Sequence, residues 1–252
     1  MTRRSRTQLG ANRMGGTPVK TIGILEAGLP PSRLQPVFGR YDAMMRIMLG
    51  SDFSYRTFEV HADSLPEQPE ACDAYILTGS SAGVYDPLPW IDPLKNFVRA
   101  ARGRAKLIGI CFGHQIMAEA FGGSVEKSPK GWGLGVHRYE LVDLVPGLST
   151  HERASVASIA SHQDQVTVPP PGARVVGGSD FTPCGMLDYG ADGVSIQLHP
   201  EFSREFAEAL LRLRRARLPD PGGVDHALAS LARPTDAAAI AQWLRGFLRD
   251  AG

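Results

Sequence analysis

The sequence has few cysteines and none of the spacings that would pair them. Three of its 252 residues are cysteine, and no two of these form a C-x-x-C motif. This scarcity argues against a disulfide framework or a zinc site and favours a reducing compartment, so we expect a cytoplasmic protein. No apolar run reaches the roughly 18 residues that a membrane span requires. The N-terminal twenty residues also lack the apolar core of a signal peptide.

The sequence also lacks an excess of charge of one sign. Its 27 basic and 26 acidic residues give a formal net charge of +1, which offers no support for binding to nucleic acid or to a membrane surface. The exception is the stretch 1–18, which is basic and polar and contains no acidic residue. We expect this arm to be disordered and residues 19–252 to form a single domain.

Short apolar runs alternate with helical patterns in the first half of the chain. We predict strands at 21–28, 55–60, 73–80 and 105–110, helices at 38–49 and 89–103, and two closing helices at 203–216 and 235–249. Beyond residue 120 the apolar runs are shorter, are separated by Gly and Pro, and look antiparallel. The pattern predicts a three-layer α/β fold with a mostly parallel central sheet flanked by helices.

The stretch KLIGICFGHQ places Cys111 where the strand at 105–110 ends and a helical pattern begins. An abrupt strand-to-helix turn exposes the side chain at its apex, and Gly109 and Gly113 supply the small neighbours that such a turn needs. The helix N-terminus stabilises negative charge, and its free N–H groups can hold an oxyanion. The pattern therefore favours a nucleophilic thiol, with a buried structural cysteine as the alternative.

A base for this nucleophile is offered by the segment SIQLHPEF. It reads as a short apolar strand that ends at His199, followed by Pro200 and Glu201. Strand ends in α/β sheets are where functional sites gather. His199 could accept the thiol proton and Glu201 could orient the imidazole, which is the arrangement of nucleophile, base and orienting carboxylate.

These two motifs together resemble those of the class I glutamine amidotransferases, whose pattern is Gly-x-Cys-x-Gly-x-Gln with a downstream His-Pro-Glu. The resemblance extends from about Thr21 to about Arg215 and includes the glutaminase domain of GMP synthetase. It implies a flavodoxin-like catalytic domain that needs neither a metal nor an organic cofactor. It also implies that Cys111 is the nucleophile, His199 the base and then acid, and Glu201 the orienting carboxylate.

The resemblance further implies an oxyanion hole. One donor would be the backbone N–H of Phe112, which follows the nucleophile. The second would lie in the loop after the strand at 73–80, where the family has Gly-Gly-Pro and this chain has TGSSAG. Gly79 is the best match, and Ser80 is the alternative.

Substrate-binding residues are implied in the same way. Gln115 matches the Gln of the elbow motif, which in the family contacts the bound glutamine; the alternative is that Gln115 faces solvent. Ser161 and His162 match a segment that holds the ends of the substrate, although His162 could be a structural loop residue. We expect Trp132 near the mouth of the site, and we expect His114 to have no catalytic role.

The resemblance leaves the substrate open. The chain contains no Walker-type phosphate loop and has no room for a synthetase domain, so a glutaminase would release ammonia for a separate acceptor enzyme. The first alternative is a stand-alone γ-glutamyl peptidase or hydrolase with the same thioester chemistry. The second is a non-catalytic regulator on the same fold, against which the intact set of Cys111, His199 and Glu201 argues.

Overall fold

The computed structural model describes residues 19–142, 145–148, 154–218 and 220–250, so the basic arm predicted at 1–18 lies outside the described residues. Its strands are β1 (Thr21–Leu25), β2 (Ser54–Phe58), β3 (Ala74–Leu77), β4 (Lys106–Ile110), β5 (Ser124–Lys127), β6 (Gly133–Leu141), β7 (Ser155–His162), β8 (Asp164–Val168), β9 (Arg174–Gly178), β10 (Met186–Asp188) and β11 (Gly193–Ile196). Its α-helices are α1 (Gln35–Phe38), α2 (Tyr41–Leu49), α3 (Ile91–Ala101), α4 (Phe112–Ala120), α5 (Arg204–Arg214), α6 (Pro221–Ser230) and α7 (Ala237–Arg249). Short 3-10 helices lie at Val60–Ala62, Pro69–Ala71, Gly190–Asp192 and Arg215–Arg217.

A central sheet runs through the described part of the chain in the order β2-β1-β3-β4-β11-β10-β9-β6-β7. The strands from β2 to β11 are mutually parallel, and from β11 to β7 each neighbour is antiparallel. Strand β3 is buried at every position, as expected for a parallel strand covered on both faces. The predicted mostly parallel sheet and the antiparallel second half are both confirmed.

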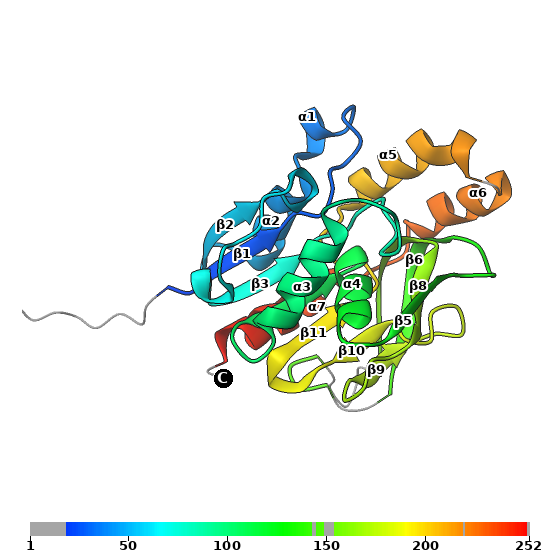
Figure 1. Ribbon diagram of the computed structural model, residues 1–252. Coiled ribbons are helices and arrows are strands. Elements are labelled where there is room, and N and C mark those ends of the chain that lie inside the picture. Colours follow the sequence, from blue (N-terminus) through cyan, green and yellow to red (C-terminus); the bar gives the residue numbers. More distant parts are fainter. Residues whose placement is uncertain (1–18, 143–144, 149–153, 219, 251–252) are drawn as a thin grey trace, which may run out of the picture.

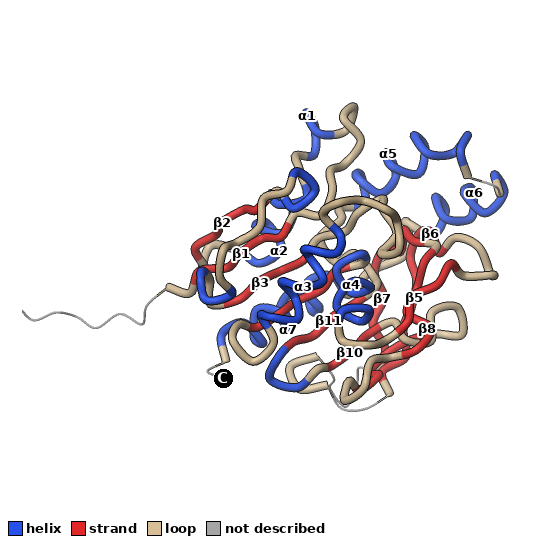
Figure 2. Tube along the Cα trace, viewed as in Figure 1, coloured by secondary structure: helices blue, strands red, loops and turns tan. Residues whose placement is uncertain are grey.

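Helices cover the two faces of this sheet, as Figures 1 and 2 show. On one face, Met45 and Leu49 of α2 share a core with Leu244 of α7. On the other face, Leu94 of α3 and Ile116 of α4 belong to a second core. Strands β5 and β8 form a separate antiparallel pair. The carboxyl ends of β1, β3, β4 and β11 meet at one edge, where ligands bind in open α/β sheets.

The sequence patterns predict no helix at Pro221–Ser230, and the structure has α6 there. Gly222 and Gly223 lower the helix propensity of this stretch, which hides it from a pattern search. Val224 and Ala227 are buried in a third core, together with Leu210 of α5. Tertiary burial therefore compensates for the weak local propensity.

Candidate active site

The backbone turns at Cys111, between β4 and α4. Cys111 has φ 53° and ψ −104°, a strained conformation for a non-glycine residue, and its N–H donates to the Ile196 carbonyl over 2.9 Å. A Cβ atom at Gly109 would lie 2.5 Å from the Gly113 carbonyl oxygen, and one at Gly113 would lie 2.4 Å from the Leu77 carbonyl oxygen. The two glycines are therefore required by close backbone packing, and Cys111 sits at an elbow of the predicted kind.

His199 lies beside this elbow because β11, the strand before it, pairs in parallel with β4. Its N–H donates to the Ile159 carbonyl over 2.7 Å, and the Ser158 hydroxyl donates to the His199 carbonyl over 3.1 Å. The Phe202 ring stacks on the imidazole with centroids 4.0 Å apart and planes 9° apart. Strand β7, in the antiparallel half of the sheet, thus holds the backbone of His199, and Phe202, in the loop before α5, holds its ring.

The His199 imidazole is paired with Glu201. Its Nδ1 donates to Glu201 Oε1 over 2.7 Å, and both side chains are almost fully buried. Burial by itself lowers the pKa of His199, but the charges of Cys111 and Glu201 and the hydrogen bonds to both outweigh it and raise that pKa. The arrangement therefore favours the protonated imidazolium form of His199.

The residues expected to form an oxyanion hole surround the thiol. The Phe112 N–H begins helix α4, where the first amides have no partner inside the helix. A Cβ atom at Gly79 would lie 3.0 Å from His199 Cε1 and 3.8 Å from Cys111 Cβ, so the Gly79 backbone adjoins both groups. Ser80 lines the cleft, and its hydroxyl accepts a hydrogen bond from the Ala82 N–H over 3.1 Å.

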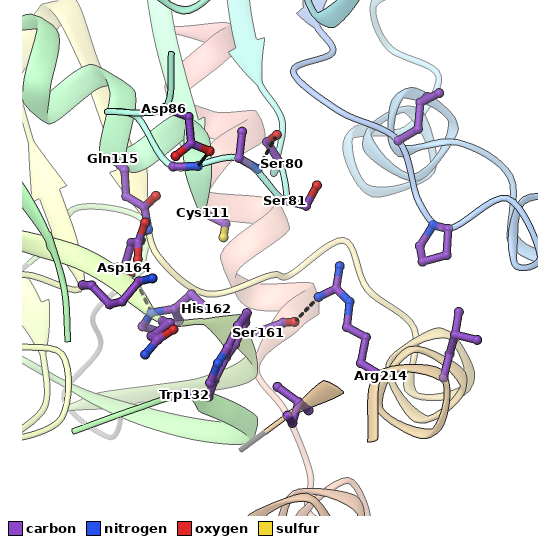
Figure 3. A pocket seen from close by; sticks show the side chains of 18 of the residues that line it. Ser80, Ser81, Asp86, Cys111, Gln115, Trp132, Ser161, His162, Asp164 and Arg214 are labelled. Atoms are coloured by element: carbon purple, nitrogen blue, oxygen red, sulfur yellow. Dashed lines mark hydrogen bonds between the residues drawn. The ribbon is translucent and has the colours of Figure 1, made fainter. Parts of the chain in front are cut away.

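Cys111 opens into a cleft of about 940 Å³, shown in Figure 3. Ser80, Ser81 and Asp86 lie on one side of the thiol, and Ser161, His162 and Trp132 lie on the other. The charged side chains that line the cleft are Arg33, Asp86, Lys127, Asp164 and Arg214. Trp132 lines the cleft, as the sequence predicts.

Gln115 does not face solvent, so that alternative is wrong. The side chain is 3% exposed, and its Nε2 donates to the Asp164 carbonyl over 2.7 Å and to Gln197 Oε1 over 3.1 Å. The whole first turn of helix α4 is buried, because strand β8 packs against the side of the helix that Gln115 occupies while Gly113 packs against β3. Gln115 nevertheless lines the cleft beside Cys111.

Ser161 and His162 both line the cleft as well. The Ser161 hydroxyl accepts a hydrogen bond from Arg214 Nη1 at 3.5 Å. His162 Nδ1 is 3.0 Å from the Asp164 carbonyl, while its buried Nε2 has no partner. Burial lowers the pKa of His162 to about 3, so this ring is neutral at physiological pH.

Sequence reasoning missed two side chains of the site. Gln197 is fully buried, and its Nε2 lies 3.5 Å from Cys111 Sγ. Its position two residues before His199 is a usable signal, because alternate residues of an extended chain lie on the same face. Arg214 belongs to α5, and its guanidinium points toward Ser161 in the cleft. No local pattern around Arg214 distinguishes it from the other arginines of that helix.

The remaining candidates lie outside the site. His114 is fully buried and contacts the Ser195 hydroxyl at 2.7 Å, and burial lowers its pKa to about 3. Cys72 and Cys184 are buried free thiols in the second core. Among the described residues no group of three or more His, Cys, Asp or Glu side chains could hold a metal ion. None of the described helices has the length and apolarity needed to cross a membrane.

Replacing Glu201 with glutamine is expected to lower the pKa of His199. The variant removes a carboxylate charge that, with Cys111, raises that pKa, so the imidazole should lose its proton at lower pH than in the wild type. The measurement is an NMR titration of the His199 ring in both proteins. Glu208→Gln, on the exposed face of α5, is the control and should leave the curve unchanged. An unchanged curve for Glu201→Gln would contradict the assigned pairing.

The fold and the elbow define an α/β protein with a thiol at a strand–helix junction. The family model for glutamine amidotransferase class-I matches residues 48–213. A glutamine amidotransferase-like protein of Schizosaccharomyces pombe is 28% identical over 77% of this chain and 84% of its own length. Gamma-glutamyl peptidase 2 of Arabidopsis thaliana is 31% identical over 55% of this chain and 57% of its own length.

Two further comparisons extend this result. A GMP synthase (glutamine-hydrolyzing) of Thermus thermophilus is 36% identical over 51% of this chain, and the matched region covers 24% of the length of that enzyme. The crystal structure of a glutamine amidotransferase from Thermotoga maritima superposes with a TM-score of 0.71 at 17% identity, covering 92% of this chain and 99% of that one. The chain belongs to the class I glutamine amidotransferase family, and the predicted fold and resemblance are confirmed. Its relatives support hydrolase activity.

Proposed function

We propose that this protein hydrolyses the side-chain amide of glutamine through a γ-glutamyl thioester and supplies the ammonia to a separate acceptor enzyme. The observation that carries the proposal is the convergence of Cys111, His199 and Glu201 beyond the ends of two adjacent parallel strands, with Cys111 lining a cleft. The catalytic unit lies within residues 19–252, and its proposed steps need no metal or organic cofactor.

In the proposed mechanism the Cys111 thiolate attacks the γ-carbon of the substrate, forming a carbon–sulfur bond. The N–H of Phe112 and a backbone N–H at Gly79 or Ser80 stabilise the oxyanion. The His199 imidazolium gives its proton to the departing nitrogen as the carbon–nitrogen bond breaks and ammonia leaves. A water molecule then gives a proton to His199 and attacks the thioester, which releases glutamate and restores the thiolate.

Substrate binding is assigned to the residues that line the cleft next to the thiol. Gln115, Ser161 and His162 approach it from α4 and β7, and their side chains offer both donors and acceptors. His162 contributes a neutral ring to the wall of the cleft. Arg214 forms no ion pair with any described residue and can pair with a substrate carboxylate.

A second candidate is a stand-alone γ-glutamyl peptidase, in which an amino acid or peptide leaves in place of ammonia. The size of the cleft favours it. At about 940 Å³ the cleft lies near the top of the ~300–1,000 Å³ range that is typical of sites for drug-sized ligands. That is more space than one glutamine needs, and the basic side chains of Arg33 and Lys127 could receive the carboxylate of a peptide leaving group.

The test is glutamate release by the purified chain alone, measured in parallel on glutamine and on a panel of γ-glutamyl dipeptides, with Cys111→Ala as the blank. Turnover confined to glutamine would support the first candidate. A chain that is inactive alone and becomes active when an acceptor enzyme is added would support it as well. A kcat/KM at least tenfold higher on dipeptides would favour the second. A chain whose Cys111 is no more reactive toward iodoacetamide than Cys72 would contradict both.

A further inference from the structure

A buried glutamine contacts the sulfur of the proposed nucleophile. Gln197 lies just after β11 and is fully buried, and its backbone N–H donates to the Gly185 carbonyl over 2.9 Å. Its Nε2 lies 3.5 Å from Cys111 Sγ, within the range for a nitrogen donor and a sulfur acceptor. The thiol is thus contacted by an amide in addition to the imidazole of His199.

The orientation of this amide is fixed by its neighbours. The Asp164 carbonyl can only accept, so the Gln115 atom 2.7 Å from it must be the donating Nε2. The same Nε2 lies 3.1 Å from the Gln197 side chain, which must present its oxygen there. The NH₂ group of Gln197 is then the only part of its amide that can face Cys111 Sγ. One backbone carbonyl therefore sets the direction of both side-chain amides.

We infer that Gln197 is a further catalytic residue that stabilises the Cys111 thiolate by an N–H···S hydrogen bond, and that Gln115 is the positioning residue that aims its amide. This inference rests on the proposed function, because it gives the thiolate a role. It assigns Gln115 a second task besides lining the cleft, namely to hold the donor of Gln197 toward the sulfur.

The chemistry favours such a donor at this position. A buried thiolate loses the hydrogen bonds that water would give it, and a donor fixed in place replaces one of them. The protonated His199 supplies a second donor, but it must give up that proton when the leaving group departs. Gln197 keeps its N–H donors at every step, because a side-chain amide does not exchange its proton with the leaving group or with water during the cycle. Its donation is therefore available to the free thiolate before the attack and again when the thiolate is regenerated.

The experiment is the rate of Cys111 alkylation by iodoacetamide at pH 6 and at pH 9, followed by mass spectrometry of the Cys111 peptide. Gln197→Met keeps the approximate size of the side chain and removes the donor. From the strength of hydrogen bonds to charged groups, we expect the alkylation rate of Cys111 at pH 6 to fall by about tenfold or more. The loss should be smaller at pH 9, where hydroxide drives ionisation without the donor.

A second variant keeps the test informative if Gln197→Met does not fold. Gln115→Glu is nearly isosteric but replaces the donating NH₂ with an acceptor, so the Gln197 amide should turn its oxygen toward the sulfur. We expect this variant, like Gln197→Met, to lose more of its Cys111 alkylation rate at pH 6 than at pH 9. Alkylation needs no bound substrate, so the part of Gln115 in substrate binding does not affect this readout. Gln165→Met removes another buried glutamine, one that contacts Ser128, and should leave the rates unchanged.

The outcomes separate the inference from the proposed function. If the alkylation rate fell by the same factor at pH 6 and at pH 9, Gln197 would affect only the access of the reagent to the thiol. This result would overturn the inference. Unchanged rates in both variants would also overturn it. If the wild-type Cys111 reacts no faster than the buried Cys72 and Cys184, the proposed function itself fails. A loss confined mainly to pH 6 in a protein with a fast wild-type thiol supports both.

Discussion

Replacing Cys111 with alanine is expected to reduce glutamate release by about 10⁴-fold or more, because members of a catalytic triad act as a unit and the variant has no nucleophile. The oxyanion donors and the binding residues remain, so any residual turnover would come from positioned water. The measurement is single-turnover glutamate release on the best substrate of the γ-glutamyl panel, with free glutamate followed over hours. The large expected effect makes contamination by trace wild-type enzyme the main source of error.

Cys184→Ala is the matched control, since Cys184 is a buried free thiol that does not line the cleft. We expect this variant to keep the rate of the wild type. Circular dichroism should show the same spectrum for both variants, because neither substitution adds volume. If Cys111→Ala released glutamate at the wild-type rate, the result would contradict the thioester mechanism.

Replacing Gly113 with alanine is expected to lower the free energy of unfolding by about 3 kcal/mol or more, at the upper end of what overpacking costs. The added Cβ would lie 2.4 Å from the Leu77 carbonyl oxygen and 2.7 Å from Leu77 Cβ. Both belong to β3, which cannot move without disturbing its pairs with β1 and β4. Helix α4 must therefore shift away from the sheet, and the elbow with it. Urea unfolding measures the loss.

Gly246→Ala in α7 is the control for the glycine substitution. A Cβ atom there would meet nothing within 4 Å, and the residue lies inside a regular helix. We expect the free energy of unfolding to rise by about 0.5–1 kcal/mol, because alanine lowers the entropy of the unfolded chain. Similar losses for both variants would mean that close packing at Gly113 is not what requires glycine there.

The sequence by itself determined the fold class and the local form of the elbow. Apolar runs such as the one before Cys111 specify strands that are buried on both faces, and Gly109 and Gly113 specify a tight turn. Each is a short-range pattern, set by the backbone and by the nearest residues along the chain. His199 and Glu201 belong to the same class of signal, since they flank Pro200 in a short motif just after β11. The assignment of catalytic roles to these residues remains a prediction.

Only the tertiary structure decided what surrounds the thiol. Gln115, Gln197 and Asp164 come from three separate elements, and their hydrogen bonds depend on β11 lying beside β4 and on α4 packing against the sheet. Helix α6 forms against α5 in spite of its two glycines, because burial outweighs propensity there. Arg214 reaches the cleft because α5 lies over its rim, which no local pattern encodes. Local patterns carry no information on contacts between distant segments, and those contacts set the direction of each polar group at the site.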